Sequence, residues 1–295
     1  MKVFVTGATG WVGSAIVQQL LQDGHQVLGL VRSEANAQAL TAAGATPLLG
    51  SLADLASLRR GAEQADGIIH TAFGLDLADI AKSSAEEQQA IKTLGEALAG
   101  SNRPLIATSG LGFAPLGEVL PEAMTLPKMP GFPRDPEQPV WAIAEQGVRA
   151  TLVRLPRTVH GAGEQHGFMP MLIRVAREKG VSAYVGGGQN QWPAVHRLDA
   201  ARVFTLALEH GAQGGPFHAV AEQGIPFKAI AEAIGQLLGV PVVSQSPDEA
   251  ATHFGPIAMF VAGNGPATSE HTRARLGWQP IQPDLVTDLA GYTVS

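Results

Sequence analysis

Three glycines near the N-terminus carry the clearest chemical signal in this chain. Gly7, Gly10 and Gly13 follow an apolar run at residues 2–6 and precede an amphipathic stretch at residues 12–23. At such a strand-to-helix junction, the first glycine permits a tight turn, the second admits a pyrophosphate, and the third lets the helix pack closely. The helix N-terminus adds amide donors and the positive end of the helix dipole. The spacing therefore predicts a dinucleotide-binding loop.

The residues after the second apolar run, at residues 26–31, indicate which dinucleotide is preferred. A carboxylate here would bind the ribose 2′-hydroxyl of NAD, but the chain reads Arg32-Ser33 and has no acidic residue before Glu34. A guanidinium fork and a hydroxyl suit a 2′-phosphate instead. We therefore expect NADP(H) to be favoured over NAD(H).

The elements that must position this loop alternate along the first half of the chain. Short, continuously apolar runs are each followed by a helical stretch, and strands are expected at residues 2–6, 26–31, 46–49, 67–70 and 104–108. This pattern predicts a parallel sheet with helices on both faces. The predicted class is α/β, a doubly wound parallel sheet (Rossmann fold) with a smaller C-terminal substrate lobe.

The two halves are expected to divide the work. Residues 1–160 are predicted to form an NADP-binding Rossmann domain, completed by about residues 194–221. Residues 161–193 and 222–295 are predicted to form a substrate-binding lobe, because no second glycine fingerprint occurs there. Residues 110–139 contain seven prolines and four glycines, which predicts a long loop.

Composition excludes several classes of function. The chain has 295 residues and a net charge of −6, which argues against a nucleic-acid partner. It contains no cysteine, so thiol nucleophiles and Cys-ligated metals are excluded, and the spacing of its nine histidines predicts no metal site. The sequence shows no membrane span or export signal, so we expect a cytoplasmic protein without a membrane partner.

Five segments of the chain resemble the short-chain dehydrogenase/reductase superfamily, in its extended or atypical branch of the NAD-dependent epimerase/dehydratase kind. The segments are TGATGWVG (residues 6–13), HTAF (70–73), ATSG (107–110), VRLPRTVHG (153–161) and PAVHRLDAA (193–201). They extend over most of the chain, and members of this branch often form dimers. The resemblance therefore implies a dinucleotide-binding enzyme with a small-molecule substrate, and leaves a homodimer open.

The resemblance also implies individual contacts. Residues expected at the pyrophosphate are Gly7, Thr9, Gly10, Trp11, Val12 and Gly13. Residues expected along the rest of the cofactor are Arg32, Ser33, Ser51, Leu52, Thr71, Ala72, Phe73, Thr108, Pro156 and Thr158. The family usually has Asp where this chain has Ser51, so the adenine contact is weakened. Ser109 matches the serine that orients a substrate carbonyl.

The tyrosine and lysine that relay a proton in this superfamily are missing. The family pattern is Tyr-x-x-x-Lys, but Tyr184 is followed at that spacing by Gly188, and Tyr292 lies three residues from the C-terminus. Alternative proton donors are a histidine, with His196 the first candidate, Tyr184 in reserve, or an ordered water. Arg134 could supply a positive charge in place of the lysine, but we expect it to be a solvated loop residue.

These observations predict an NADP(H)-dependent oxidoreductase that reduces a small apolar carbonyl, enone or imine with a non-standard proton donor. Two alternatives stay open. One is a dinucleotide-binding sensor or scaffold without redox turnover, and the other is a non-redox lyase or isomerase on the same fold.

Overall fold

The computed structural model describes residues 1–74, 79–126, 133–212 and 214–292. Its centre is a seven-stranded sheet in the order β10-β6-β5-β4-β1-β2-β3. Every neighbouring pair in this sheet is parallel, which confirms the predicted doubly wound class. The strands are β1 (Lys2–Thr6), β2 (Gln26–Val31), β3 (Thr46–Leu49), β4 (Gly67–His70), β5 (Leu105–Gly110), β6 (Ala150–Leu155) and β10 (Phe217–His218).

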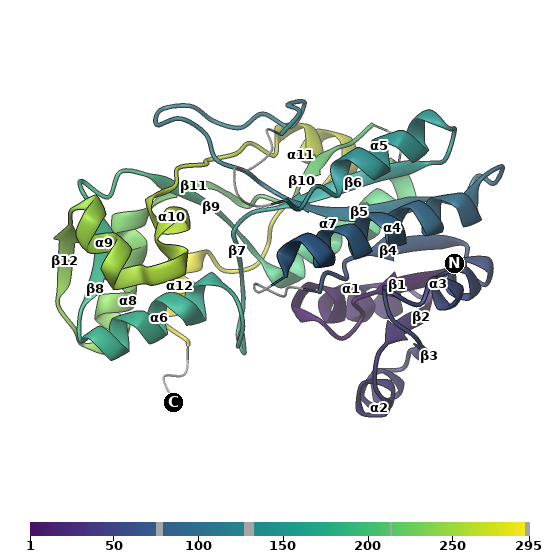
Figure 1. The fold of residues 1–295 in the computed structure, drawn as a ribbon, viewed down its shortest axis with the longest axis horizontal. Helices are drawn as coiled ribbons and strands as arrows, with labels where there is room; N and C mark the ends of the chain where they lie inside the picture. Colours follow the sequence, from purple (N-terminus) through teal and green to yellow (C-terminus); the bar gives the residue numbers. More distant parts are fainter. Residues whose placement is uncertain (75–78, 127–132, 213, 293–295) are drawn as a thin grey trace.

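Helices cover both faces of this sheet, as Figure 1 shows. On one face, α1 (Trp11–Gln22) packs against α7 (Arg197–Leu206), and their apolar side chains share one core with β1 and β2. On the other face, α3 (Leu55–Glu63), α4 (Ile80–Leu98) and α5 (Glu137–Glu145) form a second core with Phe4 and Ile68. Helix α2 (Glu34–Ala42) lies beside β2 and β3 at the sheet edge. The inner strands are mainly apolar because both of their faces are buried, and exceptions such as His70 in β4 and Arg154 in β6 are buried polar side chains.

A smaller body lies to the left of the large sheet in Figure 1. It contains a three-stranded sheet in the order β11-β9-β7 and a parallel pair, β12 and β8. The strands are β7 (Thr158–His160), β8 (Ser182–Val185), β9 (Gln191–His196), β11 (Glu222–Pro226) and β12 (Val242–Gln245). Four helices surround them: α6 (Phe168–Lys179), α8 (Phe227–Leu238), α9 (Pro247–Phe254) and α10 (Ala258–Ala262). A third core forms here around the fully buried Trp192.

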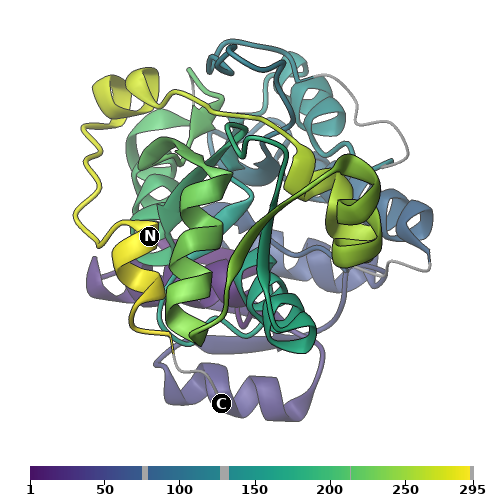
Figure 2. The same ribbon diagram turned by 90° about the vertical axis from the view of Figure 1, so that its left-hand side faces the viewer.

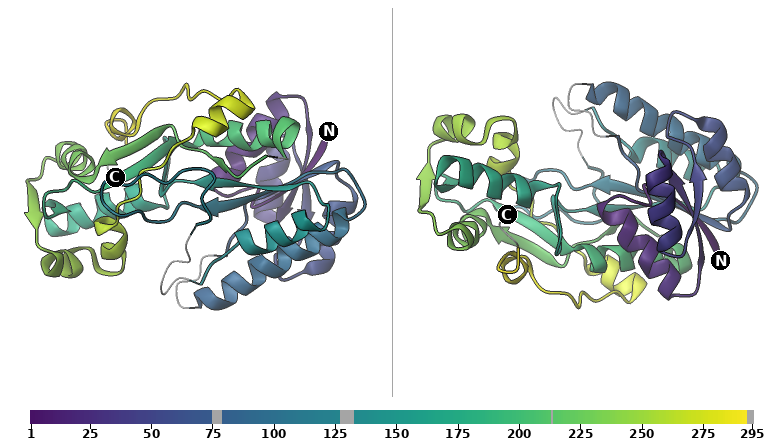
Figure 3. Two further views of the ribbon diagram at one scale, coloured as in Figure 1. Left: turned by 90° about the horizontal axis from the view of Figure 1, so that it is seen from above. Right: turned by 90° about the horizontal axis from the view of Figure 1, so that it is seen from below.

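The C-terminal segment crosses from the large sheet to the smaller body, and Figures 2 and 3 show its path in yellow. Helix α11 (Glu270–Leu276) lies against β10, and α12 (Leu285–Leu289) packs on α8 and β9. Between these two helices, the backbone amides of Ile281 and Gln282 donate to the buried carboxylate of Asp199, which lies at the start of α7. The segment therefore ties the two bodies together.

Among the residues described, no helix combines the length and the apolar character needed to cross a membrane.

Candidate active site

The glycine loop between β1 and α1 has the backbone geometry that its sequence predicts. Gly7 has a φ of 72°, in the left-handed region that favours glycine, and its carbonyl accepts from the amide of Gly10 at 2.9 Å. A Cβ on Gly13 would lie 2.0 Å from the Gly7 carbonyl oxygen, so this position admits no side chain. The α1 N-terminus has no side-chain cap and no acidic residue in its first turn. Its first amides are therefore left to bind an anion.

A cavity of about 620 Å³ opens over this loop, within the range of ligand sites. We call it the glycine-loop cavity. Its lining contains most of the residues expected at the cofactor, namely Gly7, Thr9, Gly10, Trp11, Val12, Gly13, Arg32, Ser51, Leu52, Thr71, Ala72, Phe73 and Thr108. Asn36, Glu86 and Leu155 join them, and the sequence reasoning did not single these out. The lining runs from the end of β2 to the ends of β5 and β6, an elongated site that fits a dinucleotide.

Three expected cofactor residues do not line this cavity. The hydroxyl of Ser33 accepts from the amide of Asn36 at 3.3 Å, because Ser33 is the N-cap of α2. Pro156 and Thr158 are buried at the start of the smaller body. The Thr158 hydroxyl has no hydrogen-bond partner among the described residues.

A second cavity of about 490 Å³ lies between the end of β5, the loop that follows it, and the first turns of α5. We call it the Ser109 cavity. Its lining consists of Ser109, Gly110, Leu111, Gly112, Thr125, Leu126, Arg134, Asp135, Pro136, Glu137, Gln138, Trp141, Ala142 and Glu145. Ser109 is 4% exposed, and its hydroxyl bonds to none of the described residues. Because Thr108 lines the first cavity and Ser109 lines the second, the two cavities adjoin at the end of β5.

Arg134 occupies the boundary between the two cavities, so its prediction as a solvated loop residue is wrong. Its Nε and Nη2 donate to the two carboxylate oxygens of Glu87 on α4, at 2.9 and 2.6 Å. Its guanidinium carbon lies 4.4 Å from the centre of the Phe73 ring, and Nη2 also reaches the Thr108 carbonyl oxygen at 3.4 Å. Burial raises the pKa of Glu87, while the charge of Arg134 opposes that rise.

His70, beneath the glycine loop, is held in its neutral form. Its Nδ1 lies 2.8 Å from the hydroxyl of Thr6, and the side chain is fully buried. Burial, assisted by the positive charge of Arg134, lowers the pKa of His70 to about 3. His70 therefore brings no charge to the base of the glycine loop at neutral pH.

Family models match both halves of this arrangement. A family described as NAD(P)H-binding matches residues 7–169, and the NAD dependent epimerase/dehydratase family matches residues 137–220. The chain belongs to the extended short-chain dehydrogenase/reductase family. The resemblance found in the sequence is confirmed.

Alignments with three relatives cover from 72% to 98% of this family member. The chain is 51% identical to "Uncharacterized protein C2A9.02" of Schizosaccharomyces pombe over 98% of both chains. It is 30% identical to a 4-hydroxy-2-methyl-3-oxo-4-farnesyl-3,4-dihydroquinoline-1-oxide ketoreductase of Stigmatella aurantiaca, covering 72% of this chain and 66% of the ketoreductase. Among solved structures, DesIV, a dTDP-glucose 4,6-dehydratase from Streptomyces venezuelae with NAD and TYD bound, aligns with a TM-score of 0.78 at 20% identity. That alignment covers 98% of this chain and 95% of DesIV, and it supports the fold.

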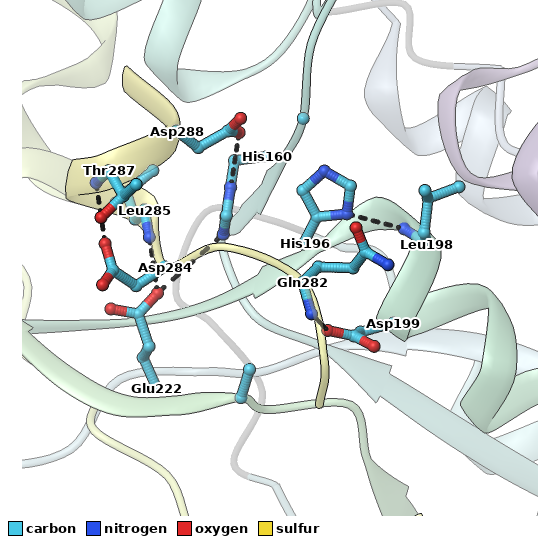
Figure 4. A network of polar contacts seen from close by, with 12 residues as sticks. His160, His196, Leu198, Asp199, Glu222, Gln282, Asp284, Leu285, Thr287 and Asp288 are labelled. Carbon is cyan, nitrogen blue, oxygen red and sulfur yellow. Dashed lines mark hydrogen bonds and ion pairs between the residues drawn. The ribbon is translucent and has the colours of Figure 1, made fainter. Parts of the chain in front are cut away.

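His196, the first histidine candidate in this extended short-chain dehydrogenase/reductase, lies outside both cavity linings. Its Nδ1 accepts from the amide of Leu198 at 3.2 Å, and its ring meets that of His160 edge-on at 5.4 Å. Figure 4 shows these two rings beside Asp288, whose carboxylate lies 2.8 Å from Nδ1 of His160. Burial lowers the pKa of both histidines, and for His196 the neighbouring His160 adds to the effect.

This histidine cluster still adjoins the glycine loop through Trp11. The indole nitrogen of Trp11 donates to the carbonyl of Val159 in β7 at 2.7 Å. The guanidinium of Arg197, the residue after His196, lies 4.2 Å from the centre of the Trp11 ring.

The two tyrosines of this family member lie away from both cavities. Tyr184 is in β8, where its ring packs at the edge of the third core, 5.7 Å from Nζ of Lys228. Tyr292 donates its hydroxyl to the carboxylate of Glu164 at 2.6 Å. Burial raises the pKa of Glu164 to about 7. Neither tyrosine meets Ser109 in a shared cavity.

Proposed function

We propose that this protein is an NADP(H)-dependent oxidoreductase that reduces a small apolar carbonyl, enone or imine. One observation carries the proposal: a glycine-loop cavity suited to a dinucleotide adjoins a second cavity that contains Ser109. The ketoreductase relative supports reduction as the type of reaction.

The preference for NADP(H) rests on the end of β2. Arg32 and Asn36 line the glycine-loop cavity there, whereas Glu34, the nearest carboxylate after β2, does not. A guanidinium and an amide are donors for a 2′-phosphate, and no carboxylate from this turn competes for the ribose.

When bound, the reduced dinucleotide supplies the hydride. The chain's own residues then orient the substrate and shield it from water. The Ser109 hydroxyl, which hydrogen-bonds to none of the described residues, would donate to the substrate oxygen. Leu111, Leu126 and Trp141 provide apolar walls in the same cavity, and these suit a small apolar substrate.

Direct titration of the purified protein tests the cofactor half of the proposal. Calorimetry with NADPH and with NADH should show binding of both, with NADPH the tighter ligand. Absence of binding by either dinucleotide would refute the proposal.

Turnover tests the chemical half. A panel of neutral aldehydes, ketones, enones and imines should include compounds that oxidise NADPH, and Ser109→Ala should lower kcat about 100- to 1,000-fold while leaving the NADPH Kd unchanged. NADPH binding without oxidation on the whole panel would instead support the sensor. Product formation without net oxidation would support the lyase or isomerase.

A further inference from the structure

We propose that Arg134 is the cationic donor that binds the oxygen of a neutral carbonyl substrate beside Ser109. This inference rests on the proposed reductase function and assigns the group that stabilises the developing negative charge.

The first observation is how the guanidinium is held. Arg134 has a side chain only 17% exposed, and Glu87 opposite it is 2% exposed. Two parallel hydrogen bonds join the pair, and the Phe73 ring lies under the guanidinium. A planar guanidinium fixed on two sides in this way is pre-organised.

The second observation is which donors remain. Nε and Nη2 are occupied by Glu87 and Thr108, but Nη1 donates to no residue that the structure describes. Arg134 and Ser109 line the same cavity, and we infer that the Nη1 end of the guanidinium faces it. Two donors are thus available there for one substrate oxygen.

The charges around this cavity select the substrate class. Arg134 is paired with Glu87, and Glu137 is paired with Arg154 through two hydrogen bonds of 2.7 Å. Glu145, which is exposed, adds a negative charge to the lining. A substrate that carries its own carboxylate would be repelled, so we infer a neutral aldehyde or ketone.

The chemistry balances without a tyrosine. The hydride of NADPH would form the new C–H bond, the carbonyl π pair would move onto oxygen, and NADP⁺ would leave oxidised. Arg134 and Ser109 would hold the resulting alkoxide while a proton from water completes the alcohol. In this step Arg134 acts by charge and hydrogen bonding rather than by proton transfer.

The test compares variants of the full-length protein with a carbonyl substrate found in the panel. Arg134→Met should lower kcat about 100- to 1,000-fold, the cost of removing one donor to a developing oxyanion. The NADPH Kd, measured by calorimetry, should change less than about threefold. Arg59→Met removes an arginine from an exposed ion pair on α3 and serves as the matched control with unchanged turnover.

A paired variant guards against misfolding. Arg134→Met alone leaves Glu87 buried without a partner, whereas Arg134→Met with Glu87→Met replaces the whole ion pair by apolar side chains of similar size. The double variant should fold, bind NADPH and show the same loss of kcat. If it turns over at the wild-type rate, or if both variants lose NADPH binding together with activity, Arg134 is not the substrate donor.

The substrate class is tested with wild-type protein and a matched pair of compounds. Benzaldehyde should be reduced with a kcat/KM at least about tenfold above that of 4-carboxybenzaldehyde. Preference for the carboxylate would overturn the assignment of a neutral substrate. If the wild-type protein reduces no carbonyl compound, the proposed reductase function is refuted. If the wild type and the Arg134 variants are equally active, only the role of Arg134 is refuted.

Discussion

The contact between Glu164 and Tyr292 predicts how stability depends on pH. Glu164 lies on the loop between β7 and α6, and its carboxylate accepts from the Tyr292 hydroxyl near the C-terminus. Burial raises the pKa of this carboxyl from an ordinary 4.5 to about 7. Replacing Glu164 by Gln keeps the size of the side chain and removes the titration.

The direction follows from the raised pKa. The folded protein binds the Glu164 proton more tightly than the unfolded chain does, so the free energy of unfolding falls as pH rises through the interval between the two pKa values. At about 1.4 kcal/mol per pKa unit, the fall amounts to at most about 3.5 kcal/mol between about pH 4.5 and about pH 7. Above that interval the contribution is constant.

Urea unfolding at several values from about pH 5 to about pH 8 measures this contribution. Subtracting the free energy of unfolding of Glu164→Gln from that of the wild type removes the titration that the two proteins share. This difference should become less favourable to the wild type as pH rises. Tyr292→Phe removes a hydrogen bond that lowers the pKa of Glu164. In this variant the fall in the free energy of unfolding should therefore continue to a higher pH than in the wild type. Parallel pH curves for wild type and Glu164→Gln would refute the reasoning.

Three further substitutions test the sites described above. Gly13→Ala places a Cβ 2.0 Å from the Gly7 carbonyl oxygen, so we expect NADPH affinity to fall about 100-fold or more by calorimetry while the circular dichroism of the fold is retained. Arg32→Glu should reverse the ratio of NADPH to NADH affinity, because a carboxylate repels the 2′-phosphate and accepts from the ribose hydroxyl. Arg154→Met leaves the carboxylate of Glu137 buried without its partner and should cost about 3–5 kcal/mol in urea unfolding, most of which Arg154→Met with Glu137→Met should restore.

The dinucleotide half of the fold could be predicted from the sequence because its signals are local. The strands at the centre of the parallel sheet are mainly apolar runs, and Gly7, Gly10 and Gly13 follow one another from the end of β1 into the first turn of α1. The residues that together form the dinucleotide-binding loop are close to one another in the sequence. The same reasoning placed Arg32 at the end of β2, where it lines the cavity.

Interactions between distant segments could not be predicted in this way. Arg134 was expected in solvent because it lies in a proline-rich loop, yet its partner Glu87 is 47 residues away on α4. Glu87 sits among other polar residues of that helix, and nothing in the local pattern marks it as buried. Likewise, the sequence could not show that His196 would bond to its own helix N-terminus or that Tyr184 would lie in an outer strand.

The four tryptophans of the chain are distributed as built-in optical reporters. Trp11 lines the glycine-loop cavity and Trp141 lines the Ser109 cavity, whereas Trp192 and Trp278 are fully buried in the two bodies. Emission from Trp11 overlaps the absorption of a reduced nicotinamide, so cofactor binding would quench it by energy transfer. A Trp141→Phe variant would separate the substrate signal from the cofactor signal, and the buried pair would report unfolding. Occupancy of each cavity and integrity of each body can thus be followed without an attached label.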